Sequence, residues 1–373
     1  MRRAKRHFWQ HLGTSILAWT IAAVLFSLVR LYGVEEESLY RLKGSGQDVL
    51  SVIWVQGLVA GVAFGLLFGL LNLLLDRFTS RQTPYWLLIL LRTGGHLLLA
   101  MIVVVISLGI PHVVAKDFEH FSWMELMREG PFSKTAFVII IYTGILSILF
   151  NLLRQISDLV GAGILWNLIT GKYHRPQEEE RIFMFLDLKS STTYAERLGH
   201  VLYSELIQDC FVDLTEAIEK HDVEVYQYVG DEAVLTWKPE DGLARNNCLE
   251  AYFTFEASIQ ARARYYFNKY DLVPAFKAGG NIGMVMVAEV GVIKKEIAYH
   301  SDVLSTAARI QGQCNRLEQR LLISDALRDR ILNLDPYEVA EEGRFRLRGK
   351  ESEVKLFSIR KSSESERNFV FSE

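Results

Sequence analysis

Four long apolar stretches dominate the first 160 residues of the chain. Each is close to the roughly 20 predominantly apolar residues that a helix needs to cross the hydrocarbon core of a bilayer. The first two contain no Asp, Glu, Lys or Arg, while the third holds Arg92 and His96. The pattern predicts four membrane-spanning helices, at Gln10–Val29, Val49–Leu75, Pro84–Ala115 and Thr135–Leu153.

The second half of the chain mixes short apolar runs with amphipathic helical periods. Helices between hairpins predict an α+β sandwich with a largely antiparallel sheet. We expect helices at 202–220, 244–268 and 302–313, with a short helix after 321–324. We expect strands at 182–187, 223–229, 233–237, 275–281, 284–289, near 297, at 321–324, and a last hairpin at 345–348 and 354–359.

These patterns divide the chain into a four-span transmembrane domain (1–160), a juxtamembrane linker (161–180), a soluble domain (181–360) and a flexible tail (361–373). In the linker, Ile164–Thr170 is typical of a short amphipathic stretch at the membrane surface. A cleaved signal peptide is the alternative for the first apolar stretch. It is disfavoured because no clear small-x-small cleavage site follows and three more spans do.

Basic residues in the short loops predict the orientation of the membrane domain. The N-terminus, the second loop and the segment after the last span are basic, whereas the first and third loops are acidic. Both termini and the soluble domain are therefore expected on the cytoplasmic side of an inner or plasma membrane. Arg92 and His96 share a helix face. We favour Arg92 reaching toward lipid headgroups over a functional role at membrane depth.

Net charge and cysteine spacing bear on nucleic-acid binding and on the oxidation state of the cysteines. A formal net charge of −3 gives no support for binding nucleic acid, which needs a basic face. Cys210, Cys248 and Cys314 show no Cys-x-x-Cys spacing and lie in apolar, helix-like surroundings. They are expected to be buried, reduced thiols rather than ligands or disulfides.

Two carboxylates carry the clearest chemical signal. Asp187 ends an apolar strand, and Asp231 lies at the tip of a predicted hairpin. An ionised carboxylate at the end of a buried strand is costly unless a cation offsets it, so the pair indicates a divalent metal site. The alternative is two unrelated turn residues, since Asp is common in turns.

The order of these motifs resembles the catalytic domain of class III adenylate and guanylate cyclases. The resemblance covers about residues 178–360 and rests on Asp187 with its following Ser/Thr turn, Val229-Gly-Asp231-Glu, and Ser305-Thr-Ala-Ala-Arg309. It implies a ferredoxin-like fold in which Asp187 and Asp231 hold two Mg²⁺ or Mn²⁺ ions. Backbone N–H groups of Leu188, Lys189, Ser190, Ser191 and Thr192, at a strand-to-helix turn, are expected to bind phosphates.

The resemblance also implies roles for residues from a second chain. Arg309 aligns with an arginine that stabilises charge on the α-phosphate and comes from the partner subunit, so a head-to-tail homodimer is expected. Ser305 stands where the family usually carries Asn, and Ser301 stands where it usually carries Gly. Arg348 and Lys350 resemble a basic segment that contacts the triphosphate; a solvated hairpin charge is the alternative.

The two positions that read the purine base depart from the family. Gln227 stands where Lys or Glu is expected, and Ala298 where Asp, Thr or Cys is usual. Neither residue specifies ATP or GTP. ATP is favoured because bacterial members of this type more often resemble adenylate cyclases.

Together these patterns predict a membrane-anchored nucleotidyl cyclase, a lyase that converts ATP (or GTP) to a 3′,5′-cyclic nucleotide and pyrophosphate. The alternative is a catalytically silent homologue that binds nucleotide and transmits a membrane signal. A diguanylate cyclase is disfavoured because Val229–Ala233 lacks the Gly-Gly-(Asp/Glu)-Glu-Phe pattern. A transporter is disfavoured because the four spans show no paired intramembrane charges in the sequence.

Overall fold

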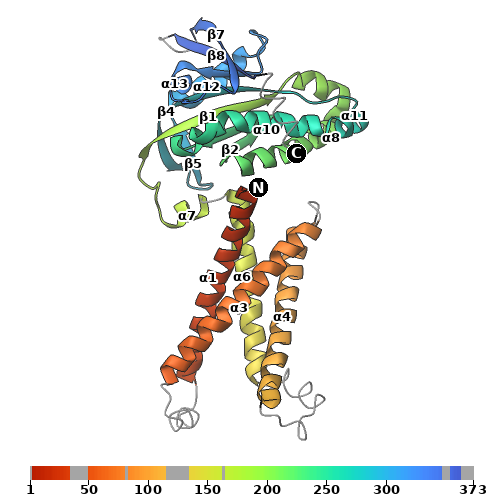
Figure 1. Cartoon of the computed structure of the whole chain (residues 1–373), viewed down its shortest axis with the longest axis vertical. Coiled ribbons are helices and arrows are strands. Elements are labelled where there is room, and N and C mark those ends of the chain that lie inside the picture. Colours follow the sequence, from red (N-terminus) through yellow and green to blue (C-terminus); the bar gives the residue numbers. More distant parts are fainter. Residues whose placement is uncertain are drawn as a thin grey trace. The chain divides into compact units, whose positions relative to one another are not determined.

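The structure, a computed structural model, describes residues 2–33, 49–79, 83–114, 134–161, 164–346 and 353–362. It forms two compact units, Arg2–Val160 and a second unit from Gly161 onward. Each unit has its own core, and each is described by itself below (Figure 1).

The first unit consists of four long helices, α1 (Arg2–Gly33), α3 (Val49–Phe78), α4 (Tyr85–Val114) and α6 (Lys134–Val160). Each contains a segment long and apolar enough to cross a membrane: His11–Val29, Gly57–Phe78, Tyr85–Val103 and Ala136–Ser157. Trp19, Phe68 and Ala100 form the centre of a small buried cluster. Most other large apolar side chains of these helices face outward, as expected where lipid replaces water.

Glycines on α3 let this helix approach α1 closely. They recur every four residues, at Gly57, Gly61, Gly65 and Gly69. A Cβ atom added to Gly65 would lie 2.4 Å from the Cα of Ile16, far inside van der Waals contact. Without Cβ atoms, the backbones can pack directly, which favours association of helices in a bilayer.

The expectation that Arg92 reaches out to lipid headgroups is wrong. Its side chain is only 8% exposed, and Nη2 lies 2.6 Å from Oδ1 of Asp76. Arg154 contacts the other oxygen of Asp76 at 2.7 Å. Asp76 thus joins α3, α4 and α6. The three charges are separated in the sequence, so the sequence did not show their pairing. The premise used against a transporter, that these helices carry no paired charges, is therefore wrong as well.

His96 is buried beside this triad. Its ring stacks on Phe68 with centroids 4.3 Å apart, and Nδ1 lies 2.7 Å from Oγ of Ser147. The shared face of Arg92 and His96 therefore points into the helix unit.

The second unit is a mixed sheet flanked by helices (Figure 1). Its strands are β1 (Gln177–Leu188), β2 (Glu224–Val229), β3 (Glu232–Trp237), β4 (Phe276–Val290), β5 (Glu296–His300), β6 (Leu321–Ser324), β7 (Tyr337–Phe345) and β8 (Val354–Lys361). The order is β2-β3-β1-β4-β6-β8-β7, and β5 pairs with β4. The β4–β6 pair is parallel and the other recorded pairs are antiparallel, so the predicted fold class is confirmed.

Helices of the second unit separate onto two sides of the central strands. Its longer helices are α8 (Ser191–Lys220), α10 (Asn247–Ala261), α11 (Ala263–Tyr270) and α12 (Asp302–Gln313); short elements are α7 (Ile164–Ile169), α9 (Pro239–Gly242), η1 (Ala244–Asn246) and α13 (Asp325–Arg328). Ile182, Met184 and Leu186 of β1 pack in the large core that includes α8, α10 and α11. The alternating Phe183 and Phe185 pack in a second core with α12, as the two-residue period of a strand requires.

Several predicted bounds need correction. The two strands expected at 275–281 and 284–289 are one strand, β4. Gly283 lies inside this strand and marks a close approach, because a Cβ there would lie 2.7 Å from Val303 Cγ2. The first strand of the last hairpin is β7, at Tyr337–Phe345 rather than 345–348. The helix expected at 202–220 begins at Ser191, with a kink at Gly199, and the one expected at 244–268 is split at Arg262.

The cysteine prediction is confirmed. Cys210, Cys248 and Cys314 are free and buried. Burial raises the pKa of each thiol to about 12, so they stay protonated at neutral pH and are poor ligands or nucleophiles.

Candidate active site

Strand geometry places Asp187 on the side of the sheet that faces α12. Phe183 and Phe185 belong to the core on that side, and Asp187 follows them at the two-residue period of the strand. It is the penultimate residue of β1 and is partly exposed, between the buried Leu186 and Leu188. Its side chain, 22% exposed, is therefore carried by a mostly buried strand but reaches solvent.

Asp187 lies in a row of three charged residues across three strands. Glu232 of β3 is its register partner on one side, and Lys277 of β4 is its partner on the other. Facing partners project from the same side of a sheet, where like charges repel. Nζ of Lys277 lies 3.0 Å from Oδ2 of Asp187 and so offsets the repulsion between the two carboxylates.

Asp231 lies at the tip of the β2–β3 hairpin, beside this row. The turn needs Gly230, which has a φ of +61°, in the left-handed region that glycine adopts at little cost. Oδ2 of Asp231 is buried and has no hydrogen-bond partner among the described residues. An orphaned, buried carboxylate oxygen is rare in folded proteins and needs an explanation.

The carboxylates of Asp187 and Asp231 act on the same two neighbours, Glu232 and Tyr203. Burial raises the pKa of Glu232, and the charges of Asp187 and Asp231 raise it further. Burial, followed by the charge of Asp231 and, more weakly, that of Asp187, likewise raises the pKa of the Tyr203 hydroxyl. Both acidic groups are therefore close enough to act on the same two neighbours.

This donor set suits a divalent cation that takes further ligands from a substrate. In the described part of the chain no three His, Cys, Asp or Glu side chains are grouped to hold a metal by themselves. Two carboxylates, one with an unpartnered buried oxygen, fit Mg²⁺ or Mn²⁺, because Mg²⁺ commonly binds one or two carboxylates plus phosphates and water.

The turn after Asp187 presents backbone N–H groups beside the carboxylates. The N–H of Lys189 is engaged, since it donates to the carbonyl oxygen of Ala275 at 2.8 Å, and Leu188 pairs with Phe276 in the sheet. Ser190 has a left-handed φ of 61° and caps α8 without a side-chain hydrogen bond. The N–H groups of Ser190, Ser191 and Thr192 remain for an anion at this helix N-terminus.

Arg309 and Ser305 lie on a different face of α12 from the one that reaches Asp187. Nε2 of Gln311 donates to Oδ2 of Asp187 at 2.9 Å, so Gln311 marks the inward face. Arg309 precedes it by two residues, about 200° around the helix axis. Ser305, one turn before Arg309, lies on the same side as that arginine. By this helix geometry, Arg309 does not share the face that carries Gln311 to Asp187.

Neither side chain of this α12 pair makes a recorded hydrogen bond or ion pair to a residue outside its own helix, among the described residues. The hydroxyl of Ser305 donates to the carbonyl oxygen of Asp302 at 3.0 Å, back into its own helix. Arg309 is half-buried, and no hydrogen bond or ion pair joins it to another described residue.

The two predicted base-reading positions lie on β2 and β5. Gln227 pairs with Val234 just after a bulge in β2, and Ala298 pairs with Ala288. Their neighbours Tyr226 and Tyr299 touch each other, with ring centroids 5.0 Å apart. Arg348 and Lys350 lie outside the described residues.

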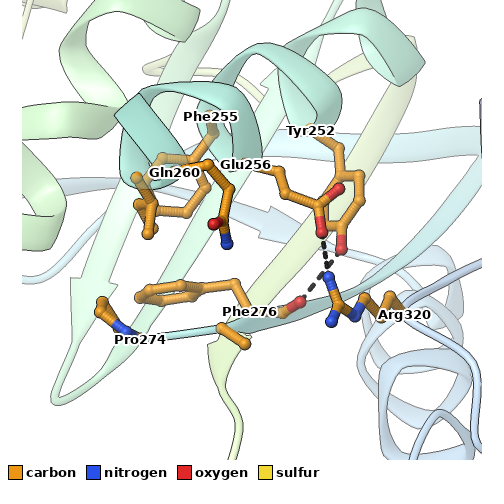
Figure 2. Close-up of a pocket in the computed structure, with 9 residues that line it drawn as sticks. Tyr252, Phe255, Glu256, Gln260, Pro274, Phe276 and Arg320 are labelled. Atoms are coloured by element: carbon orange, nitrogen blue, oxygen red, sulfur yellow. Dashed lines mark hydrogen bonds and ion pairs between the residues drawn. The ribbon is translucent and has the colours of Figure 1, made fainter. Parts of the chain in front are cut away.

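A separate pocket between α10 and the start of β4 is not part of this site. In Figure 2 the Arg320 guanidinium meets the Glu256 carboxylate and the Tyr252 hydroxyl reaches the backbone of Phe276. None of the predicted site residues lines it. Its two charged side chains are already paired with each other, so it offers little to a charged ligand.

Four residues near Asp187 and Asp231 were missed by the sequence reasoning: Tyr203, Glu232, Lys277 and Gln311. Glu232 stands next to Asp231 in the motif and could have been noticed. The other three are distant in sequence from both aspartates, and only the strand register and the docking of α8 and α12 bring them in.

The second half of the chain is similar to known proteins. A family model described as the adenylate and guanylate cyclase catalytic domain matches residues 174–361, half of the chain. Adenylate cyclase 2 of Rhizobium meliloti (strain 1021) is 34% identical over 177 residues, which cover 48% of this chain and 49% of that protein. The chain thus spans about half the length of this curated relative.

Two solved structures of a bacterial light-regulated adenylyl cyclase are similar in fold. One has a TM-score of 0.51 at 16% identity, covering 58% of this chain and 63% of that one. The other has a TM-score of 0.52 at 15% identity, covering 64% and 70%. At these identities the likeness concerns the fold alone. Together with the family match, it identifies the chain as a member of the adenylate and guanylate cyclase catalytic domain family, the class III cyclases.

Proposed function

We propose that this protein is a membrane-anchored nucleotidyl cyclase that converts ATP to 3′,5′-cyclic AMP and pyrophosphate at an interface between two copies of the chain. The proposal is supported by two observations: Asp187 and Asp231 act on the same neighbours beside a helix N-terminus, and one buried oxygen of Asp231 has no partner among the described residues. This combination of acidic ligands and free N–H groups suits a metal-bound triphosphate.

The reaction is an intramolecular displacement. The ribose 3′-hydroxyl gives up its proton to solvent, and its oxygen forms a bond to the α-phosphorus. The bond from that phosphorus to the bridging oxygen breaks, and pyrophosphate leaves with the electron pair. Divalent ions held by Asp187 and Asp231 would supply charge neutralisation for the 3′-oxygen and the phosphates. The chain's own task is positioning and electrostatic stabilisation, which dominate phosphoryl transfer.

The residues around the carboxylates divide this task. The N–H groups of Ser190, Ser191 and Thr192 would bind phosphate oxygens, because a helix N-terminus favours negative charge. Arg348 and Lys350 would add cationic contacts to the triphosphate. Gln227 and Ala298 would border the purine, where Ala298 contributes shape without a hydrogen bond.

Arg309 would come from the partner chain. On its own chain it faces away from Asp187, about 200° around α12 from Gln311. In a head-to-tail homodimer each chain would present its carboxylates to one nucleotide and its Arg309, with Ser305, to the other. Such an arrangement gives two composite sites, as expected of a closed two-fold assembly.

The four apolar helices support a membrane anchor. The basic N-terminus and second loop support a cytoplasmic location of both termini and of the second unit. ATP is proposed as the substrate because the curated relative is an adenylate cyclase; cyclic GMP formation is the less favoured outcome.

A direct experiment tests the proposal. The full chain, purified in detergent, is incubated with Mn²⁺ and an equimolar mixture of ATP and GTP, and the products are identified by mass spectrometry. Cyclic AMP and pyrophosphate are expected, and Asp187→Asn and Asp231→Asn should each abolish them. Unchanged product formation by either variant would refute the metal assignment.

A catalytically silent homologue is the second candidate. The Ser305 hydroxyl favours it, because it is directed to the carbonyl oxygen of Asp302 rather than presented as a donor on the helix surface. Nucleotide binding without product in the same experiment would support this reading.

A further inference from the structure

Two side chains from different elements meet at one oxygen of Asp187. Nε2 of Gln311 donates to Oδ2 at 2.9 Å, and Nζ of Lys277 lies 3.0 Å from the same atom. No hydrogen bond from a described residue reaches Oδ1. One edge of the carboxylate is therefore occupied by the protein, and the other is left for a ligand.

Gln311 is held rigidly where it makes this contact. The residue is 7% exposed, and its backbone lies directly over Gly279 of β4. A Cβ atom on Gly279 would be 2.2 Å from the Gln311 nitrogen, so only glycine permits this docking of α12. A neutral amide donor fixed in this way restrains the orientation of Asp187 without competing as a cation.

Lys277 makes a contact of another kind. It is the cross-strand neighbour of Asp187, and its side chain is only 13% exposed. Its ammonium group places a positive charge beside the carboxylates of Asp187 and Glu232, in the region where a divalent cation is proposed to bind. Like charges repel strongly at such distances when water is scarce.

We propose that Gln311 is a positioning residue that fixes Asp187 for metal binding, and that Lys277 is a tethered cation that competes with the divalent metal for the same carboxylate. The inference rests on the proposed metal role of Asp187, but it requires no turnover. It assigns opposite effects to two neighbours of one oxygen.

The two effects separate in a binding measurement. Mn²⁺ binding to the full-length protein in detergent is titrated by electron paramagnetic resonance, without nucleotide. Lys277→Met should bind Mn²⁺ roughly tenfold more tightly than the wild type, because a nearby positive charge is lost. Gln311→Met, which keeps the side-chain length but removes the donor, should bind roughly fivefold more weakly because Asp187 is no longer held.

Matched controls come from pairs elsewhere in the chain. Lys295→Met removes a lysine that lies 2.6 Å from Glu289, and Gln319→Met removes an amide that donates to Glu342 at 2.9 Å. Both should leave Mn²⁺ affinity unchanged. Melting temperatures of all four variants identify any that bind weakly only because they are unfolded.

The outcomes decide between the possibilities. Tighter binding by Lys277→Met together with weaker binding by a folded Gln311→Met supports the inference, whether or not the wild type forms cyclic nucleotide. A shift of both variants in the same direction, or no shift in either, overturns it. Failure of the proposed function appears separately, as Mn²⁺ binding by a wild type that yields no cyclic product.

Discussion

Arg181 and Glu224 are joined across the β1–β2 side of the sheet, with Nη1 2.7 Å from Oε2. The Arg181 side chain is only 4% exposed and also contacts Glu179 at 2.8 Å. Lys172 lies 2.9 Å from Glu179, and the Tyr173 hydroxyl donates to it at 2.8 Å. The buried Arg181 guanidinium thus links β1 to β2 through Glu224. Through Glu179 it also links both strands to the segment at Lys172 and Tyr173.

Replacing Arg181 by Met should destabilise the second unit by about 3 kcal/mol, because it leaves the Glu179 carboxylate half-paired in a buried position. The control is Arg330→Met, which breaks an exposed pair with Glu180 at 2.7 Å and should cost under about 1 kcal/mol. Thermal unfolding followed by circular dichroism measures both. Equal shifts in the two variants would contradict the importance of burial.

The network also predicts a pH dependence. Burial alone would raise the pKa of Glu179. Hydrogen bonds from Lys172, Tyr173 and Arg181 outweigh burial and lower this pKa from 4.5 to about 2. A lowered pKa means that the stabilisation is fully present above pH 4.5 and is lost as the pH falls toward 2. At pH 7 the free energy of unfolding of the wild type should exceed that of Glu179→Gln by about 3 kcal/mol. Unfolding measured from pH 7 down to pH 2 should show this gap closing, and a constant gap would argue against the lowered pKa.

The contact between α1 and α3 predicts a sharp difference between two glycines. Gly65→Ala places a methyl group against the backbone of Ile16, whereas a Cβ on Gly94 of α4 meets nothing within 4 Å. Gly65→Ala should destabilise the helix unit by about 1–3 kcal/mol, and Gly94→Ala should leave it unchanged or slightly more stable. Thermal aggregation in detergent compares them; similar melting points would show that the close approach is not needed.

The serine on α12 predicts a gain of function. Ser305→Asn provides a longer donor that is not limited to the Asp302 carbonyl. If it reaches the nucleotide, it should raise kcat by about tenfold, the equivalent of one added hydrogen bond of about 1.4 kcal/mol in the transition state. Initial rates with ATP and Mn²⁺ provide the measurement. A decrease in kcat would show that the serine itself is the better residue here.

Composite sites predict complementation between two inactive chains. Asp187→Asn and Arg309→Met should each be inactive as homodimers. When the two variants are co-expressed, half of the dimers would be mixed, and each would contain one intact site. Roughly a quarter of wild-type activity should then return, by the counting of a two-fold dimer. No recovery, in membranes where both variants are present, would mean that Arg309 acts within its own chain or not at all.

The sequence alone determined the features that depend on local pattern. Runs of apolar residues predicted the four long helices because spanning length is set by the bilayer. The motif order around Asp187, Asp231 and Arg309 predicted the family, and the family match confirms it. The metal, phosphate and base-reading roles of the individual residues stay predictions.

Tertiary structure decided what depends on contacts between distant segments. Lys277 faces Asp187 because of a cross-strand register, and Gln311 reaches it because α12 docks on Gly279. Arg92 pairs with Asp76 across two helices, which reverses its expected exposure. The sequence pattern predicts which residues are buried or need a charged partner. Which partner each residue contacts depends on how the strands align and the helices pack. These contacts join residues that are distant in the sequence, so they form only in the complete fold.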